Sequence, residues 1–352
     1  MRRDLPALTS HEWIVAIHAH SIYSDGSGTV EEIIQAGQDA GLDVLILTDH
    51  NTLEARERGY EGWHDRLLLI VGDEVSSRQG HCISLGTQTH VDHKQSLHGI
   101  LQDIHDQDGL SFIAHPYGKA RPLLKTHDHS WKDWSADSMT GLELWSYMFD
   151  WASTFHYTRF PRYYQSPDDY LTGPNPATVR KWDELCQRKR VVAFGGVDAH
   201  AKSYPILPWV VFPYEMLFGT IRTHLLLDTP PTGDATSDIE SVLTGLAAGQ
   251  AFLTHDGRAD SKGTRFGTLD GNLSIGHETT FEGPVELMFD LPLEAQITLL
   301  CNGRPIRHEV TNALKHDVEE PGIYRIEATL GDRPWLYTNP IYLREQPDSA
   351  TA

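Results

Sequence analysis

Cysteine is scarce in this chain, which has three such residues among 352, namely Cys82, Cys186 and Cys301. Their odd number and wide spacing exclude a disulfide framework and a zinc site built from paired cysteines. Long apolar runs are also missing, because no stretch approaches the roughly 18 apolar residues of a membrane span. The first residues likewise lack the apolar segment of a signal peptide. We therefore expect a soluble, cytoplasmic protein.

Positive charge is scarce as well. The chain has 29 Lys and Arg against 49 Asp and Glu, which gives a net charge of −20. This balance disfavours binding to nucleic acid through its phosphates, and binding to anionic membranes, because both need a basic surface. Histidine, in contrast, is abundant, with 20 residues. A chain rich in histidine and carboxylates but poor in cysteine predicts a metal site of imidazole and carboxylate ligands.

Short apolar runs alternate with amphipathic segments over the first 256 residues. Strands are predicted at residues 13–17, 43–48, 67–71, 81–86, 111–114, 142–145, 191–194 and 250–254. Helices are predicted at residues 29–40, 95–107, 177–187 and 238–248. The first helix begins with a capping-box pattern from Thr29 to Glu32. This alternation is typical of an α/β fold, with a parallel sheet that is open or closed into a barrel.

The residue composition and the hydrophobic pattern change twice along the chain. Residues 119–176 are aromatic, polar and proline-containing, which favours long loops over one end of the sheet. After residue 276 the pattern becomes one of short strands, at 285–289, 296–301, 322–328 and 341–343. We therefore expect a first domain over residues 1–275 with an insertion at 119–176. A small antiparallel β domain over 276–346 and a disordered tail over 347–352 are expected to follow.

Potential metal ligands lie close to the ends of the predicted strands. They are His18, His20, Asp25, Asp49, His50, Glu74, His81, His115, Glu143, Asp198 and His200. Because carboxyl ends of parallel strands share one face, we expect most of these side chains to converge. Without thiolates, such a set suits Mn, Zn or Fe, and its size indicates two or three ions. His127, Asp128 and His129 have similar spacing, but their polar surroundings favour a surface loop.

Six segments together resemble a known family. HAHSIYSDGS, LTDHN, GDEVSSRQGH, AHP, LELW and GVDAH occur in this order. They resemble motifs of the PHP (polymerase and histidinol phosphatase) family of metal-dependent phosphoesterases, over about residues 13–256. The Gly-His pair after Glu74 and the β-rich C-terminal segment are most similar to the branch that resembles carbaryl hydrolase. The resemblance implies a distorted, seven-stranded TIM-like (β/α) barrel that holds up to three metal ions.

The resemblance also implies roles for individual residues. One metal would be held by His18, His20, Glu74 and Asp198. Glu74 would bridge to a second metal, also held by His81 and His115, and a third would be held by Asp25, His50 and His200. Asp198 would orient or deprotonate the attacking water. Asp49 and Glu143 are expected to support ligands, with a purely structural role equally open for Glu143.

The sequence leaves the substrate open. We expect a hydrolase that attacks a small phosphorylated metabolite or nucleotide with metal-activated hydroxide, without an organic cofactor. Arg78, His156, Arg159, Arg222 and His224 are candidate substrate contacts or ordinary surface residues. Aromatic residues of the insertion also allow a carboxylic or carbamate ester substrate; they are Trp131, Trp134, Trp145, Tyr147 and Trp151. A non-catalytic, metal-stabilised interaction module is the third alternative, and the oligomeric state stays open.

Overall fold

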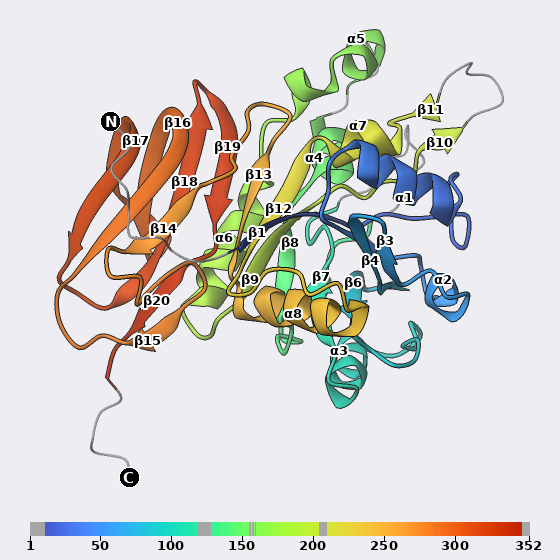
Figure 1. Ribbon diagram of the computed structural model, residues 1–352, viewed down its shortest axis with the longest axis horizontal. Helices are drawn as coiled ribbons and strands as arrows, with labels where there is room; N and C mark the ends of the chain where they lie inside the picture. Colours follow the sequence, from blue (N-terminus) through green and yellow to red (C-terminus); the bar gives the residue numbers. More distant parts are fainter. Residues whose placement is uncertain are drawn as a thin grey trace.

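The computed structural model describes residues 11–118, 128–154, 156, 158, 160–203 and 210–346. The predicted tail at 347–352 lies outside these residues. Figure 1 shows the C-terminal strands at one end of the molecule, and the strands and helices of the first half at the other.

The first three parallel strands form as predicted. β1 (His11–Ile17), β2 (Val44–Leu47) and β4 (Leu67–Val71) pair side by side. The runs VLIL and LLLIV are buried throughout, as expected for strands that are covered on both faces. Between β1 and β2, α1 (Val30–Asp39) begins with the predicted capping box, because Thr29 and Glu32 exchange side-chain-to-backbone hydrogen bonds.

A second, five-stranded sheet follows. Its strands, in spatial order, are β5 (Asp73–Ser77), β6 (Gly80–Leu85), β7 (Leu110–Ile113), β8 (Gly141–Ser146) and β9 (Val192–Gly196). β7, β8 and β9 are parallel, whereas β6 runs antiparallel to both of its neighbours. The expectation of a parallel sheet therefore holds only in part.

Two isolated bridges join the sheets where the predicted ligands lie. Ala19 pairs with Ala199, and His50 pairs with Glu74. The other edge of β1 pairs antiparallel with β12 (Ile221–Leu227), which in turn pairs with β13 (Ala251–His255). β1, β2 and β4 therefore belong to a large sheet of 13 described strands. Among the described strands no closed seven-stranded barrel is found, so that prediction is not confirmed.

The remaining elements of the first half cover or extend these sheets. The helices are α2 (Glu54–Glu57), α3 (Leu97–Asp106), α4 (Tyr147–Thr154), α5 (Phe160–Gln165), the 3-10 helix η3 (Pro167–Tyr170), α6 (Pro176–Cys186), α7 (Tyr214–Phe218) and α8 (Ala235–Ala248). The short strands are β3 (Gly62–His64), β10 (Lys202–Ser203) and β11 (Val210–Val211). In its described part, the segment expected to form loops at 119–176 contains α4, α5 and η3 besides β8. In Figure 1, α1 and α7 lie on one side of the first-half strands, and α3 and α8 lie on the other.

The C-terminal strands continue the large sheet. They are β14 (Arg265–Thr268), β15 (Glu278–Thr280), β16 (Val285–Cys301), β17 (Arg304–Val318), β18 (Gly322–Leu330), β19 (Arg333–Thr338) and β20 (Ile341–Arg344). The two strands predicted between residues 285 and 301 are one strand, with a shift of register between Asp290 and Ala295. β19 pairs antiparallel with β13, so hydrogen bonds cross the predicted boundary near residue 275. That boundary stays a prediction.

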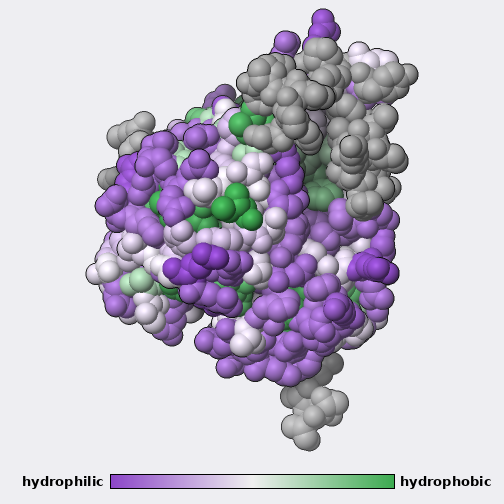
Figure 2. All heavy atoms as spheres, turned by 90° about the vertical axis from the view of Figure 1, so that its right-hand side faces the viewer, coloured by the Kyte–Doolittle hydropathy of each residue, from purple (hydrophilic) through white to green (hydrophobic). Residues whose placement is uncertain are grey.

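The face of the molecule shown in Figure 2 is mostly hydrophilic, with a few hydrophobic patches. Within the described part of the chain, no helix has the length and apolar character needed to cross a membrane.

Candidate metal centre

Loops and strand ends from both sheets bring the predicted ligands together. His18 and His20 follow β1, His50 follows β2, His115 follows β7, and Asp198 and His200 follow β9. Glu74 and His81 lie within β5 and β6. Because the two isolated bridges align these ends, residues separated by about 180 positions in the sequence face one another.

The first group of ligand atoms is fully inside the protein. Nε2 of His18 lies 3.2 Å from Oε2 of Glu74 and 3.3 Å from Oδ1 of Asp198. Nε2 of His20 lies 3.2 Å from each of the same two oxygens. His18, His20 and Glu74 are 0% exposed. This is the set that the resemblance assigned to one metal.

Glu74 connects this group to two others. Its Oε1 lies 2.8 Å from Nδ1 of His81 and 3.1 Å from Nε2 of His115. Its Oε2 lies 3.0 Å from Nδ1 of His50. The two carboxylate oxygens therefore face different groups of histidines, as a bridging ligand requires.

The third group is more open to solvent. Oδ1 of Asp25 lies 3.0 Å from Nε2 of His200 and 3.5 Å from Nε2 of His50, and the Asp25 side chain is 50% exposed. A substrate could reach this side of the cluster without displacing buried residues.

Several atoms of the cluster lack hydrogen-bond partners although they are buried. They are Nε2 of His18, both ring nitrogens of His20, Oε2 of Glu74 and Nδ1 of His115. Leaving such atoms unpaired is costly, whereas a cation coordinated by their lone pairs would compensate them. Three sets of potential ligands have atoms within 4.8 Å of one another: His18, His20, Glu74 and Asp198; His20, Asp25, His50 and His200; and His50, Glu74 and His81. The donors present therefore fit divalent metal ions.

Electrostatic coupling within the cluster is strong. Burial lowers the pKa of His18, but the carboxylates of Glu143, Glu74 and Asp198 raise it well above its ordinary value. Burial acts in the opposite direction on Glu74, yet the neighbouring histidines hold the pKa of this carboxyl well below its usual range. The carboxylates are therefore ionised at neutral pH and available as ligands.

The backbone is strained at three of the proposed ligands. His18, His115 and Asp198 have φ angles of 74°, 29° and 51°, in the region that non-glycine residues rarely adopt. Such conformations cost on the order of 1–3 kcal/mol each and tend to occur at functional sites. Here they turn side chains at strand ends toward the common centre.

Glu143 supports two of the proposed ligands. Its Oε1 lies 3.1 Å from Nδ1 of His18, and its Oε2 accepts a 2.7 Å hydrogen bond from the backbone N–H of His115. Gly196 allows this arrangement, because a Cβ atom there would lie 2.1 Å from Oε1 of Glu143. These contacts fit the orientation of His18, one of the two predicted roles of Glu143, which stays a prediction.

The hydrogen bonds of the Asp49 carboxylate go to serines among the described residues and not to the histidines of the cluster. The carboxylate accepts hydrogen bonds from the backbone N–H and the hydroxyl of Ser21 and from the hydroxyl of Ser24. These bonds hold the turn between His20 and Asp25, so Asp49 positions the chain rather than a ligand side chain.

Three neighbours of the cluster were not predicted. Nδ1 of His129 lies 3.0 Å from Nε2 of His81, so the interpretation of His129 as a surface-loop residue was wrong. Its residue type and its spacing from His127 were the signal, but the polar surroundings favoured a surface loop. Tyr214 donates a hydrogen bond to the carbonyl of His20, and Nζ of Lys202 lies 2.8 Å from Oδ2 of Asp25.

Among the described residues, two of the predicted substrate contacts, Arg222 and His224, make their contacts away from the cluster. Arg78 is exposed in the turn between β5 and β6, and His156 is exposed with its Nδ1 beside the hydroxyl of Thr158. Arg222 donates to the carbonyl of Phe218, and His224 is buried between Glu12 and Asp256. These two are structural contacts, and Arg159 lies outside the described residues.

The chain is similar in sequence or in fold to several known proteins. An uncharacterised protein of Methanocaldococcus jannaschii is 27% identical over 129 residues, which cover 31% of this chain and 69% of that protein. A two-domain protein from Bacteroides vulgatus, containing a predicted PHP-like metal-dependent phosphoesterase, has a TM-score of 0.45 at 15% identity, over 95% of this chain and 96% of that one. An amidohydrolase from Chromobacterium violaceum has a TM-score of 0.35 at 16% identity, over 53% of this chain and 87% of that one. Residues 16–165 of this chain match the PHP domain family.

Proposed function

We propose that this protein is a metal-dependent phosphoesterase acting on a small phosphorylated metabolite or nucleotide. The observation that carries the proposal is the buried Glu74, which faces three sets of imidazole ligands with unpaired ring nitrogens around it. The match of residues 16–165 to the PHP domain family supports the same chemistry. As part of the proposal we retain the distorted barrel and the branch that resembles carbaryl hydrolase.

The contacts support the ligand sets that the family resemblance implies. His18, His20, Glu74 and Asp198 would hold one ion, Glu74 with His81 and His115 a second, and Asp25 with His50 and His200 a third. Mn, Zn or Fe suits such nitrogen and oxygen ligands. When bound, these ions supply Lewis acidity that activates water and stabilises charge developing on a phosphoryl group.

The protein's own side chains would orient the reactants. Asp198 is 6% exposed, and several histidines hold the pKa of its carboxyl well below the usual range, although burial alone would raise it. An ionised Asp198 at the edge of the cluster can orient the attacking water by accepting a hydrogen bond from it. Lys202, beside Asp25 at the open side, is a cation that could contact an anionic substrate.

A small molecule is proposed as the substrate because the net charge of −20 opposes a polyanion such as DNA. Four of the five aromatic side chains that favoured a carboxylic or carbamate ester do not support that alternative, whereas Trp134 is only partly buried. Trp131, Trp145, Tyr147 and Trp151 are buried in the hydrophobic core, with at most 6% exposure.

Elemental analysis of gently purified protein, followed by phosphate release from a panel of phosphomonoesters and phosphodiesters, tests the proposal. We expect two or three ions per chain, metal-dependent release of phosphate, and loss of both in a His18→Ala variant. His308→Ala, an exposed histidine on β17, is the matched control and should retain both. A chain that binds no metal after reconstitution, or a His18→Ala variant with full activity, would overturn the proposal.

A further inference from the structure

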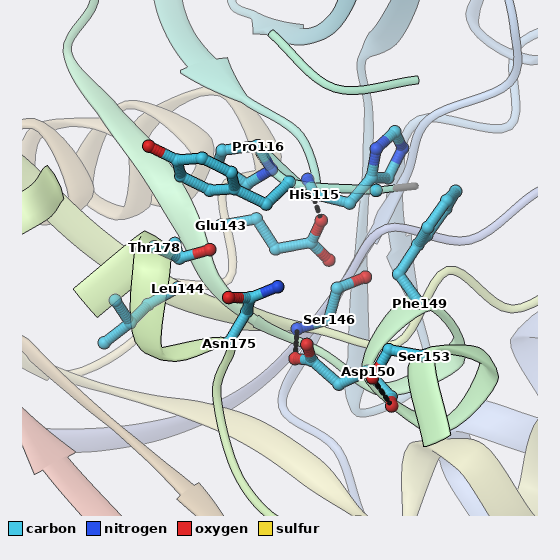
Figure 3. A pocket seen from close by; sticks show the side chains of 12 residues that line it. His115, Pro116, Glu143, Leu144, Ser146, Phe149, Asp150, Ser153, Asn175 and Thr178 are labelled. Carbon is cyan, nitrogen blue, oxygen red and sulfur yellow. Dashed lines mark hydrogen bonds between the residues drawn. The ribbon is translucent and has the colours of Figure 1, made fainter. Parts of the chain in front are cut away.

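A cavity of about 160 Å³ lies beside the candidate metal centre. His115 and Glu143 form the wall toward the cluster, and Ser146 and Phe149 lie beside them (Figure 3). Asp150, from α4, and Asn175, at the start of α6, complete the opposite side. Any molecule in this cavity would therefore be adjacent to groups bound at the cluster.

The size of the cavity limits what it can hold. An apolar cavity of about 150 Å³ is large enough for one benzene molecule. The cavity here is of similar size, whereas sites for whole drug-sized ligands measure about 300–1,000 Å³. It therefore fits one six-membered ring or a group of that size, as part of a larger substrate.

One polar side chain in the cavity wall lacks a partner. Ser146 is 4% exposed, and its hydroxyl makes no hydrogen bond, although its backbone N–H donates to Oδ2 of Asp150 at 3.1 Å. A buried hydroxyl without a partner is unfavourable. In Figure 3 the Ser146 hydroxyl and the Asn175 amide nitrogen both lie on the side facing the space between them and Glu143. A hydroxylated ligand would satisfy these groups.

The charge of the wall excludes a second anionic group. No lysine or arginine is found among the described residues that line the cavity, whereas Glu143 and Asp150 are both carboxylic acids. Burial raises the pKa of Asp150 well above its ordinary value, and the nearby Glu143 adds to this effect. A neutral Asp150 can donate a hydrogen bond, but neither acid would attract a phosphate or carboxylate.

We propose that this cavity binds the leaving group of the substrate, and that this group is an uncharged, hydroxylated, ring-sized moiety recognised by Ser146, Asp150 and Asn175. The substrate class is accordingly the phosphate ester of a cyclic polyol or sugar with a single anionic group. The assignment of a leaving group rests on the proposed function, whereas the binding site itself does not.

Binding of alcohols without phosphate tests the site independently of catalysis. We expect saturation-transfer NMR to show millimolar binding of methyl α-D-glucopyranoside to the full chain, and weaker binding of cyclohexanol. Ser146→Ala should weaken binding of the glucopyranoside about 5-fold, the effect of one hydrogen bond, without lowering the melting temperature, because its hydroxyl has no partner in the free protein. Ser241→Ala, on α8, is the control. Equal binding of both alcohols, or no effect of Ser146→Ala, would overturn the proposal.

Hydrolysis separates this proposal from the previous one. The metal-loaded protein should prefer glucose 1-phosphate to cyclohexyl phosphate and to glucose 1,6-bisphosphate, and Ser146→Ala should reduce the first preference. Phosphate release with no such preference would overturn the proposal that the cavity binds the leaving group, but not the proposed phosphoesterase activity. Binding of the glucopyranoside without any phosphate release would support the proposed binding site and contradict the proposed phosphoesterase activity.

Discussion

At the scale of single residues, Glu74 and Glu143 show how burial gives carboxylates different roles. Both are almost completely buried, and both contact His18, but on opposite ring nitrogens. Glu74 lies beside Nε2 of His18, close to other buried atoms that could coordinate a metal and that lack hydrogen-bond partners. This is the environment of a metal ligand. Glu143 also accepts a backbone N–H, which is the environment of a residue that orients a ligand.

Removal of the Glu143 carboxylate should weaken metal binding without removing a ligand. We expect Glu143→Gln to lower metal affinity about 10- to 100-fold, because contacts that orient ligands typically contribute this much. Competition with a chromogenic chelator measures the change. Glu278→Gln, whose carboxylate accepts from Arg344 in the C-terminal strands, is the control and should bind as the parent does. An unchanged affinity for Glu143→Gln would show that His18 is oriented by the backbone alone.

At the scale of elements, the strands are joined by buried ion pairs as well as by backbone hydrogen bonds. His224 of β12 lies between two carboxylates, with Nδ1 2.8 Å from Oε1 of Glu12 and Nε2 2.9 Å from Oδ2 of Asp256. Its ring stacks on Phe252 of β13. These contacts tie β1, β12 and the end of β13 together behind the candidate site.

The His224 contacts should make stability depend on pH. Burial lowers the pKa of this imidazole, but Asp256 and Glu12 raise it above its ordinary value in the folded protein. The stabilisation is therefore complete below the unfolded pKa of about 6.5 and is lost as the pH rises through the folded pKa. We expect His224→Gln to cost about 3–5 kcal/mol of unfolding free energy at pH 6, and less above the folded pKa.

Urea unfolding of the parent and of His224→Gln from pH 6 to pH 9 measures this difference. His308→Gln, at an exposed position, should show no such trend. A difference that is constant over the whole range would mean that His224 stabilises the strands by packing and not by its charge.

At the scale of the whole molecule, the C-terminal strands are anchored to the first half through both sheet and helix contacts. Beyond the pairing of β13 with β19, Arg325 of β18 reaches α6, where its Nε and Nη2 lie 2.8 and 3.0 Å from the two carboxylate oxygens of Asp183. Its Nη1 lies 2.6 Å from Oε1 of Glu327, and its guanidinium lies over the ring of Trp182. Arg325 is 1% exposed.

Breaking this anchor should destabilise the chain as a unit. We expect Arg325→Met to cost about 1–3 kcal/mol, because it removes charged hydrogen bonds to the partly exposed carboxylates of Asp183 and Glu327. Calorimetry should show one transition at lower temperature, since the sheet crosses the junction. Arg304→Met on the exposed part of β17 is the control. Two separated transitions in the parent would instead support independent domains on either side of residue 275.

The sequence by itself determined the alternating strands and helices and most of the candidate ligands. Apolar runs such as 67–71 and the cap at Thr29 are local signals, and a histidine at a strand end can be recognised without its neighbours. Only the tertiary structure decided that β1 pairs with β12, and that His129 lies against His81. It also decided that Arg222 and His224 serve the fold. These outcomes depend on contacts between residues far apart in the chain, which no local pattern encodes.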